Sequence, residues 1–413
     1  MKNGIAVKAP KISENRIDYE YEVYGAWREA FNPAEVFSIE YSRDVSSVPS
    51  GIALIPLIAN LLPMAWVYDA EITLPVCDRD FYESIPEFKK GYEAMLPMMR
   101  LGGSLRVDAL EDIRPRASGA TAAFFSGGVD AFHTLVSHAG EKPTLITVWG
   151  ADVKADDESG WANVRGHLIK VAETFGTDWI TIKSSLRTFL KEGALNRKIA
   201  VCRDGWWHAF QHSIGLISHA APLAYVEGFS RIYFASTFSA SDGRRPQCAS
   251  SPDIDNHIRF CGVRVLHDGY EFSRQRKVGR IAGFSRGTGT PVSLRVCWRS
   301  RGGQNCCRCE KCWRTILELI AEGEDPRRYG FDYSEQQKRN IWRDLYGKIE
   351  FPRFSTIYYV EIQRRMRETY GEDQLDPDLA WVLRADMKKL GYHPYQRVFR
   401  RLYYKTRRIL GLK

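Results

Sequence analysis

The chain has 413 residues, of which 44% are hydrophobic and 12% aromatic, enough to bury the cores of two or three domains. It carries 59 Lys and Arg residues against 50 Asp and Glu residues, and no apolar run reaches the length of a membrane span. The first residues lack the apolar core of a signal peptide, which predicts a cytoplasmic protein. These features disfavour a secreted or membrane-spanning protein.

Residues 1–115 form the first of three predicted domains, an α+β module to which the sequence assigns no role. Alternating apolar and polar residues predict strands at 17–24 and 37–41, and we expect the two to pair in antiparallel fashion. A third strand is expected at 70–76. The apolar segment 51–66 contains two prolines and an asparagine, so it is interpreted as a buried, broken helix.

The second predicted domain, residues 116–325, begins with the most informative segment of the chain. An apolar run at 121–125 is followed by a hydroxyl, two glycines and a carboxylate, and residues 131–136 resume as a predicted helix. The five residues of this turn are Ser126, Gly127, Gly128, Val129 and Asp130. Glycines let backbone N–H groups approach an anion, and a helix N-terminus adds about half a positive charge. The alternative is an ordinary strand–turn–helix corner.

Five of the nine cysteines fall between positions 297 and 312. Cys297, Cys306, Cys309 and Cys312 follow the spacing C-x8-C-x2-C-x2-C, which predicts a tetrahedral site for Zn²⁺. A cytosolic chain with clustered cysteines favours a metal site over disulfides. Four thiolates leave no open position for water, so the zinc is expected to be structural. Cys307 is adjacent to Cys306, and spacing alone allows either as the ligand.

The turn at 126–130 resembles the SGGxDS signature of the PP-loop ATP pyrophosphatases, with Ala131 in place of the last serine. Together with the cysteines, it makes residues 120–325 resemble the ExsB-like, 7-cyano-7-deazaguanine synthase-like branch of that superfamily. An N-terminal module ahead of such a domain also resembles the ATP-dependent muramoyl-dipeptide glutamate epimerases. The resemblance implies an α/β fold whose doubly wound parallel sheet binds a nucleotide at the carboxyl ends of its strands. Further strands are expected at 144–149, 178–183 and 231–235.

The resemblance also implies roles for individual residues. The turn from Ser126 to Asp130 would bind the β- and γ-phosphates of ATP, and Asp130 would hold Mg²⁺ or its waters. Val148 and Trp149, at the end of the second strand, would contact adenine and ribose. Arg274 and Lys277 resemble the start of the helix that faces the second substrate in this family. The candidate catalytic residues are Ser126, Asp130, Arg274 and Lys277.

A polar loop at 236–257 offers further candidates for substrate binding, because loops after parallel strands often carry function in such folds. Its candidate substrate contacts are Ser236, Arg244, Asp253 and Asp255. Arg244, together with Arg274 and Lys277, would neutralise a phosphate or a carboxylate of the substrate. Asp253 and Asp255 would bind Mg²⁺ or assist an incoming nucleophile. The alternative is a solvated loop with local turn bonds. His208 is interpreted as a core histidine, and His267–Asp268 as part of a turn.

The expected activity is adenylation, in which ATP is converted to AMP and pyrophosphate while a carboxylate or amide oxygen is activated. The acceptor would be a small metabolite or a precursor of the cell envelope or a polysaccharide, and activation would lead to ligation, amidation or epimerisation. The alternatives are an enzyme that modifies tRNA or nucleobases, and a catalytically decayed regulatory protein that binds ATP. The expected cofactors are ATP, Mg²⁺ and Zn²⁺.

The third predicted domain, residues 326–413, is helical and ends in a basic segment. Residues 384–413 contain ten Lys and Arg against the single Asp386, so this segment alone accounts for the net charge of +9. The near-neutral remainder disfavours a nucleic-acid-binding surface. The basic segment is amphipathic, and it is interpreted as a docked terminal helix with solvated charges. Peripheral contact with an anionic membrane and contact with RNA phosphates are the alternatives. Oligomerisation stays open.

Overall fold

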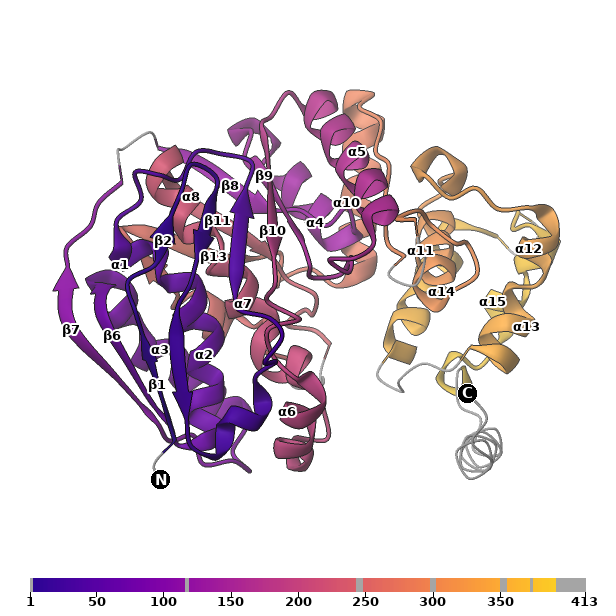
Figure 1. The fold of residues 1–413 in the computed structure, drawn as a ribbon. Coiled ribbons are helices and arrows are strands. Elements are labelled where there is room, and N and C mark those ends of the chain that lie inside the picture. The colour runs from indigo at the N-terminus through magenta and orange to yellow at the C-terminus, as the bar shows by residue number, and fades with distance from the viewer. Residues whose placement is uncertain are drawn as a thin grey trace.

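The computed structural model describes residues 3–115, 119–242, 248–297, 302–349, 355–371 and 374–390, and its fold is mixed α/β with two sheets (Figure 1). The larger sheet has the strand order β12-β13-β11-β8-β9-β10-β5-β3-β2, and the smaller sheet has the order β4-β1-β6-β7. The strands are β1 (Gly4–Val7), β2 (Lys11–Ile12), β3 (Arg16–Asp18), β4 (Tyr21–Tyr24), β5 (Ser38–Tyr41), β6 (Glu71–Asp78), β7 (Ser104–Glu111), β8 (Ala120–Phe124), β9 (Thr144–Trp149), β10 (Trp179–Ser184), β11 (Phe229–Ala235), β12 (Arg259–Phe260) and β13 (Val263–Asp268). The α-helices are α1 (Ser50–Ala53), α2 (Ile55–Tyr68), α3 (Arg79–Met95), α4 (Val129–Ser137), α5 (Glu158–Phe175), α6 (Glu192–Lys198), α7 (His212–Ile217), α8 (Ala220–Glu227), α9 (Pro252–Asp255), α10 (Arg274–Thr288), α11 (Glu310–Ala321), α12 (Glu335–Arg339), α13 (Ile341–Arg343), α14 (Thr356–Thr369) and α15 (Trp381–Arg384).

The five central strands of the larger sheet, β13, β11, β8, β9 and β10, run parallel to one another. The strands expected at 144–149, 178–183 and 231–235 are confirmed as β9, β10 and β11. The chain builds outwards from β8 in two directions, because β9 and β10 lie on one side of it and β11 and β13 on the other. The turn at 126–130 therefore leaves the carboxyl end of the strand at which the order reverses.

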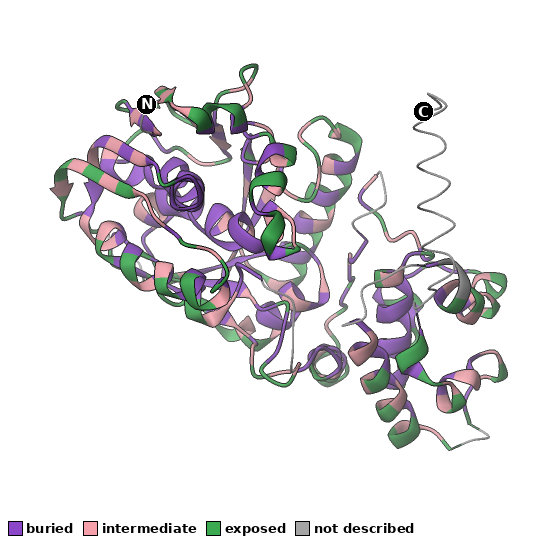
Figure 2. Cartoon of the chain, turned by 90° about the horizontal axis from the view of Figure 1, so that it is seen from below, coloured by how far each residue is buried: buried purple, intermediate pink, exposed green. Residues whose placement is uncertain are grey.

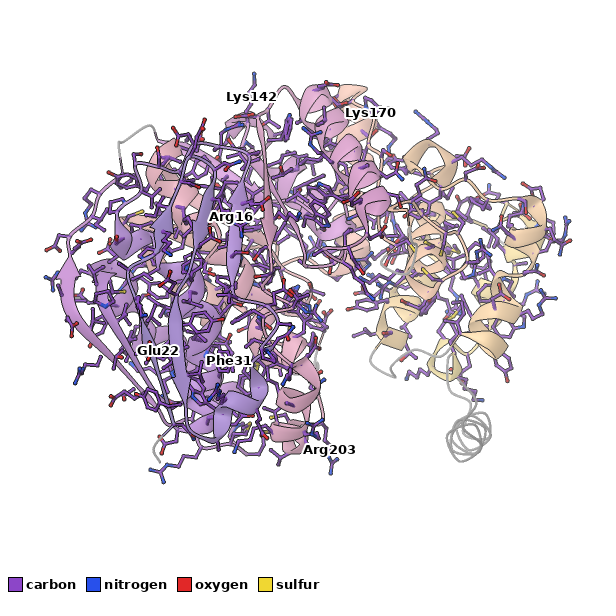
Figure 3. The ribbon with its side chains drawn as sticks, viewed as in Figure 1. Arg16, Glu22, Phe31, Lys142, Lys170 and Arg203 are labelled. Atoms are coloured by element: carbon purple, nitrogen blue, oxygen red, sulfur yellow. The ribbon has the colours of Figure 1, made fainter. Side chains whose placement is uncertain are left out.

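The N-terminal strands extend the same large sheet. β5 pairs antiparallel with β10, and β3 pairs antiparallel with β5, with Ile17 opposite Ile39. This register confirms the expected antiparallel pairing for the first part of the segment 17–24. The single strand expected there is wrong, because residues 21–24 form β4, which pairs with β1. Arg16, labelled in Figure 3, adds an ion pair to Glu40 across the two strands. Strands β2, β3 and β5 thus belong to the sheet formed by residues 120–268, whereas β4 pairs with β1 in the smaller sheet. The domain boundary at residue 115 stays a prediction.

Adjacent residues of the central strands enter two different cores, as the pleat of a strand requires. Phe124 and Ile146 pack into a core that includes α2, α7 and α8. Their chain neighbours Phe125 and Leu145 pack into a second core with α4, α5 and α10. Both faces of the sheet are therefore covered by helices, which explains why these strands are apolar runs without alternation.

The apolar segment 51–66 is a buried, broken helix, as expected. α1 ends at Ala53, Leu54 separates the two helices, and α2 begins at Ile55. Pro56 lies in the first turn of α2, where a missing N–H costs no intrahelical bond. All residues of α2 are buried, mostly against the smaller sheet and α7. Among the described residues, no helix is both long enough and apolar enough to cross a bilayer.

Helices α11 to α15 form a helical part beside the sheets, with buried residues of its own (Figures 1 and 2). α11 packs against α14 and α10, and it buries Trp313, Ile316 and Leu317. The helical character expected from residue 326 onwards holds for the described residues of this part. The basic amphipathic segment falls mainly on residues 391–413, which lie outside the described residues, so its orientation and partners stay predictions.

Candidate functional site: a cationic turn and a cysteine centre

The turn at 126–130 joins β8 to α4 through a conformation that depends on glycine. Gly127 has a φ of +78°, and a Cβ at this position would approach His167 to 2.9 Å and the Cβ of Arg295 to 3.2 Å. Gly128 is the N-cap residue of α4, and its N–H donates to Ser126 Oγ over 3.4 Å. The sequence thus places free N–H groups of the first helical turn at the carboxyl end of β8.

Asp130 lies in the first turn of α4 and contacts two buried cations. Its Oδ1 is 3.2 Å from Lys277 Nζ, and its Oδ2 is 3.3 Å from Arg274 Nη1. The Lys277 and Arg274 side chains are 2% and 9% exposed. Burial alone would raise the pKa of the Asp130 carboxyl, but Lys277 and Arg274 outweigh it and hold that pKa below its ordinary value. The structure therefore brings together three of the four residues predicted to be catalytic.

Two helices hold the cations in place. Arg274, the first residue of α10, also donates from Nε to Glu318 Oε1 over 2.9 Å and from Nη2 to Thr315 Oγ1 over 3.2 Å. Both partners lie on α11. Because Glu318 is almost completely buried, its carboxylate fixes the guanidinium through Nε while Asp130 contacts Nη1. Glu318 was not predicted from the sequence.

Lys277 connects the turn to the end of β11. Its ammonium donates to the backbone carbonyl of Ser236 as well as to Asp130. The Ser236 side chain is buried, and its hydroxyl donates to the carbonyl of Phe238. The predicted substrate contact through the Ser236 hydroxyl is therefore replaced by an internal bond, while its carbonyl helps to position Lys277.

The cysteine centre has the predicted composition. The sulfurs of Cys297, Cys306, Cys309 and Cys312 all lie within 4.8 Å of one another, an arrangement that can hold a metal ion such as zinc. The choice between the two adjacent cysteines falls on Cys306. Cys307 has a φ of +47°, and its sulfur approaches the carbonyl of Asn305 instead. Burial raises the pKa of the Cys307 thiol to about 11.

The segment that carries the first cysteine also touches the turn. Arg295, two residues before Cys297, donates its backbone N–H to the Gly127 carbonyl over 2.7 Å, and its Nη2 donates to the Ser126 carbonyl over 2.7 Å. Burial lowers the pKa of the Arg295 guanidinium, and the nearby Asp152 raises it. Asp152 follows β9 at the same edge of the sheet.

Lys311, directly before Cys312, adds another cation to this region. Lys311 as a whole is exposed, but its ammonium is surrounded by protein, and this desolvation lowers its pKa. Asp152 raises that pKa, and Arg314 and Arg274 lower it. Asp130 acts on it as well. The signal in the sequence was that Arg295 lies two residues before the cysteine motif and Lys311 lies inside it. Spacing alone does not show that Arg295 contacts Ser126 and Gly127.

The end of β9 presents an aromatic surface. Trp149 stacks on Trp161 with ring centroids 5.3 Å apart and planes 5° from parallel, and Lys183 Nζ lies 4.5 Å from the Trp149 ring centroid. Val148 is half-buried in the same strand. The two residues expected to contact a base therefore lie at the end of β9, on one side of β8. Lys277 contacts the end of β11, on the other side of β8.

The remaining candidates from the polar loop have other surroundings. Arg244 lies outside the described residues. Asp253 is exposed at the start of α9, whereas Asp255 is fully buried and binds His267 Nδ1 over 2.7 Å. Asp268 binds His138 Nε2 over 2.9 Å, so His267 and Asp268 have separate partners. Asp255 therefore acts within the protein interior, and no described contact joins it to Asp130.

Searches against protein-family models, curated proteins and solved structures find no match to this chain. The chemistry of the site is therefore inferred from its geometry. Three cations, Arg274, Lys277 and Arg295, contact a glycine turn and the first turn of the helix that follows it. Lys311 interacts electrostatically with Asp130. Such an arrangement can bind a multiply charged anion through backbone N–H groups and charged side chains.

Proposed function

We propose that the protein is a PP-loop enzyme that binds ATP at residues 126–130 and transfers its AMP group to a carboxylate or amide oxygen of a small molecule. The observation that carries this proposal is the convergence of Lys277 and Arg274 on Asp130 at the start of α4. The parallel order β13-β11-β8-β9-β10 is that of a doubly wound sheet, in which ligands bind where the order reverses. The turn leaves β8 at that point.

The charges of the site favour cleavage between the α- and β-phosphates. Backbone N–H groups at the start of α4 would hold the β- and γ-phosphates, and Lys277 and Arg274 would neutralise the charge that develops on departing pyrophosphate. Both cations are fixed by buried partners, so they need no rearrangement at the moment of reaction. This fixed arrangement is how an enzyme stabilises a transition state more than its substrate.

Asp130 and Asp152 are the carboxylates that fit Mg²⁺ at this site. Asp130 is the last residue of the turn, and Asp152, which follows β9, interacts electrostatically with Arg295 and Lys311. A bound Mg²⁺ would supply positive charge to the phosphate oxygens, and it requires only one or two carboxylates because it keeps several waters. In its absence Asp130 is balanced by Lys277 and Arg274.

The acceptor is proposed to be a small metabolite or a precursor of the cell envelope or a polysaccharide. The test mixes pure protein, ATP and Mg²⁺ with a small-molecule extract of the source cells and identifies the nucleotide products by mass spectrometry. Stoichiometric AMP and pyrophosphate that depend on the extract would support adenylation. ADP and phosphate would instead show cleavage at the γ-phosphate, and the proposal would be abandoned.

A further inference from the structure

A second group of reactive side chains lies at the end of the loop that follows β11. His208 belongs to a short π-helix, Trp207–Gln211, a rare conformation that is frequent at functional sites. Its Nδ1 lies 2.6 Å from Oδ2 of Asp204, which lies four residues earlier and before the helix. The His208 side chain is 35% exposed and that of Asp204 is 24% exposed, so this pair is accessible from solvent.

Cys248 is held beside this pair by the backbone. The N–H of Ala249 donates to the carbonyl of His208 over 2.9 Å, and Ser213 Oγ donates to the carbonyl of Ala249 over 2.8 Å. The thiol of Cys248 interacts with the side chains of His208 and His212. Because Asp204 occupies Nδ1 of His208, the other ring nitrogen is the one left for the thiol.

The surroundings of Cys248 favour a thiolate at neutral pH. Burial raises the pKa of the Cys248 thiol, but the interactions with His208 and His212 outweigh it and lower the pKa to about 6. Burial lowers the pKa of His208, and Asp204 and Cys248 raise it to about 10. From α3, the Tyr92 hydroxyl also interacts electrostatically with this thiol.

The other scattered cysteines differ from Cys248. Burial raises the pKa of Cys77, Cys202 and Cys261, and nearby carboxylates raise each of them further. None of these three has a histidine among the groups that act on it. The combination of a thiol, an imidazole and an orienting carboxylate is the arrangement of an activated nucleophile.

The same loop connects this group with the cationic site. The carbonyl of Ser236 accepts a hydrogen bond from Lys277, and the ring of Phe238, two residues later, packs edge-on against His208 with centroids 6.3 Å apart. Lys277 therefore contacts the first residue after β11, and His208 contacts the residue two positions further along the same segment.

We propose that Cys248, assisted by His208 and Asp204, is a nucleophile that takes the acyl group of the adenylated substrate as a thioester. This proposal rests on the adenylation proposed above and specifies the acceptor oxygen as that of a carboxylate. The sulfur of Cys248 attacks the carbonyl carbon of the acyl adenylate. An S–C bond forms, the bond from that carbon to the phosphate oxygen breaks, and AMP leaves with the electron pair.

The thioester then transfers its acyl group to an amine. The amine nitrogen attacks the carbonyl carbon, an N–C bond forms, and the C–S bond breaks. The sulfur leaves with the electron pair as a thiolate beside the imidazolium of His208, and the amine proton passes to solvent. The two steps form an amide from a carboxylate and an amine without any change of oxidation state.

The first test concerns the thiol alone and does not depend on the adenylation. The folded protein is alkylated with iodoacetamide across pH, and the modification of each cysteine is followed by mass spectrometry. We expect the alkylation of Cys248 to have a midpoint near pH 6, and Asp204→Asn to move that midpoint upward. A midpoint near the ordinary thiol value of about 8.5, or no modification of Cys248, would overturn the proposal.

The second test follows the acyl group. Wild-type protein, ATP, Mg²⁺ and the active extract are quenched with acid, and a thioester on Cys248 that is cleaved by hydroxylamine is sought in the intact mass. We expect the adduct in the wild type and a loss of product turnover of at least about a hundredfold in both Cys248→Ser and His208→Gln. Cys202→Ser is the matched control and should keep wild-type turnover.

The outcomes separate this proposal from the one on which it rests. If the wild type forms AMP and pyrophosphate but Cys248→Ser keeps full product turnover, the thioester is wrong and the adenylation stands. If no AMP forms, the adenylation fails, and the thioester route fails with it even where alkylation shows a thiolate. If Cys248→Ser loses one equivalent of bound metal relative to Cys202→Ser, the group is a metal site and the nucleophile is rejected.

Discussion

The backbone N–H of Arg295 donates to the carbonyl of Gly127 over 2.7 Å, and this bond ties the segment carrying the cysteine centre to the glycine turn. Cys297 lies only two residues beyond Arg295. Lys311 is the residue directly before Cys312. A metal bound by the four cysteines would therefore help to hold Arg295 beside the turn, and it would fix the backbone next to Lys311.

Loss of the metal should accordingly weaken both stability and anion binding. Cys309→Ser is expected to lower the free energy of unfolding by about 2 kcal/mol or more, because loss of a structural metal belongs to the most destabilising changes. It should also weaken ATP binding through Arg295 and Lys311. Denaturant unfolding, metal analysis and calorimetry measure these effects. Cys307→Ser is the matched control, and an equal loss of metal in it would contradict the assignment of Cys306.

Asp130→Asn should affect stability and turnover together. The substitution leaves Lys277 and Arg274 without the carboxylate that balances them, a change expected to destabilise the fold by about 2 kcal/mol at neutral pH, less than for a fully buried pair because Asp130 is 21% exposed. ATP turnover should fall by at least about a hundredfold. Parallel measurements of unfolding and AMP formation check both effects, and unchanged turnover would contradict the proposed site.

The stability contributed by Asp130 should depend on pH in one direction. Because the folded-state pKa lies below the ordinary value, the carboxylate contributes its full stability above the unfolded-state pKa of about 3.9. That contribution is lost as the pH falls through the folded-state pKa. The difference in unfolding free energy between wild type and Asp130→Asn should therefore be constant above about pH 5 and shrink below about pH 4. A difference that grows on acidification would contradict the ion pairs.

Ala131→Ser should restore a hydroxyl to the first turn of α4. One additional hydrogen bond to phosphate is worth about 1 kcal/mol, which corresponds to roughly fivefold tighter ATP binding. Ala131 is buried and packs in the core that contains α4, so unfolding is measured alongside binding. Tighter binding with little change in stability is expected. Weaker binding at unchanged stability would indicate that ATP does not meet this turn as proposed.

The sequence predicted the elements better than their contacts. The strands β9, β10 and β11 follow from apolar runs, and the break before α2 follows from Pro56, because both depend on local preferences. Pro63 lies inside α2 and does not end it. That β5 joins the large sheet beside β10 depends on tertiary pairing between residues about 140 positions apart. No local pattern encodes that pairing.

The candidate site shows the same division. Asp130, Arg274 and Lys277 were selected from a family resemblance, and their contact across more than 140 residues is a property of the fold. Asp255 shows the reverse case. Its position in a polar loop suggested substrate binding, but its carboxylate is buried and binds the imidazole of His267. Polar loop residues alone do not reveal which of them face inwards.

His208 could have been recognised more fully from the sequence. It was interpreted as a core histidine, but Asp204 lies four residues before it, the spacing at which helical side chains meet. The approach of Cys248, 40 positions later, could not be anticipated, because it depends on the backbone bond between Ala249 and His208. The choice of Cys306 over Cys307 likewise depends on a backbone angle.

The most direct test of the central claim is calorimetric titration of ATP and of pyrophosphate into wild type, Lys277→Met and Lys90→Met. Lys90 is an exposed lysine on α3, paired with Glu87, and it serves as the matched control. If the turn binds the β- and γ-phosphates, both ligands should bind the wild type and Lys90→Met equally, and Lys277→Met should bind each at least about tenfold more weakly. Equal affinities in all three proteins would contradict a phosphate site at residues 126–130.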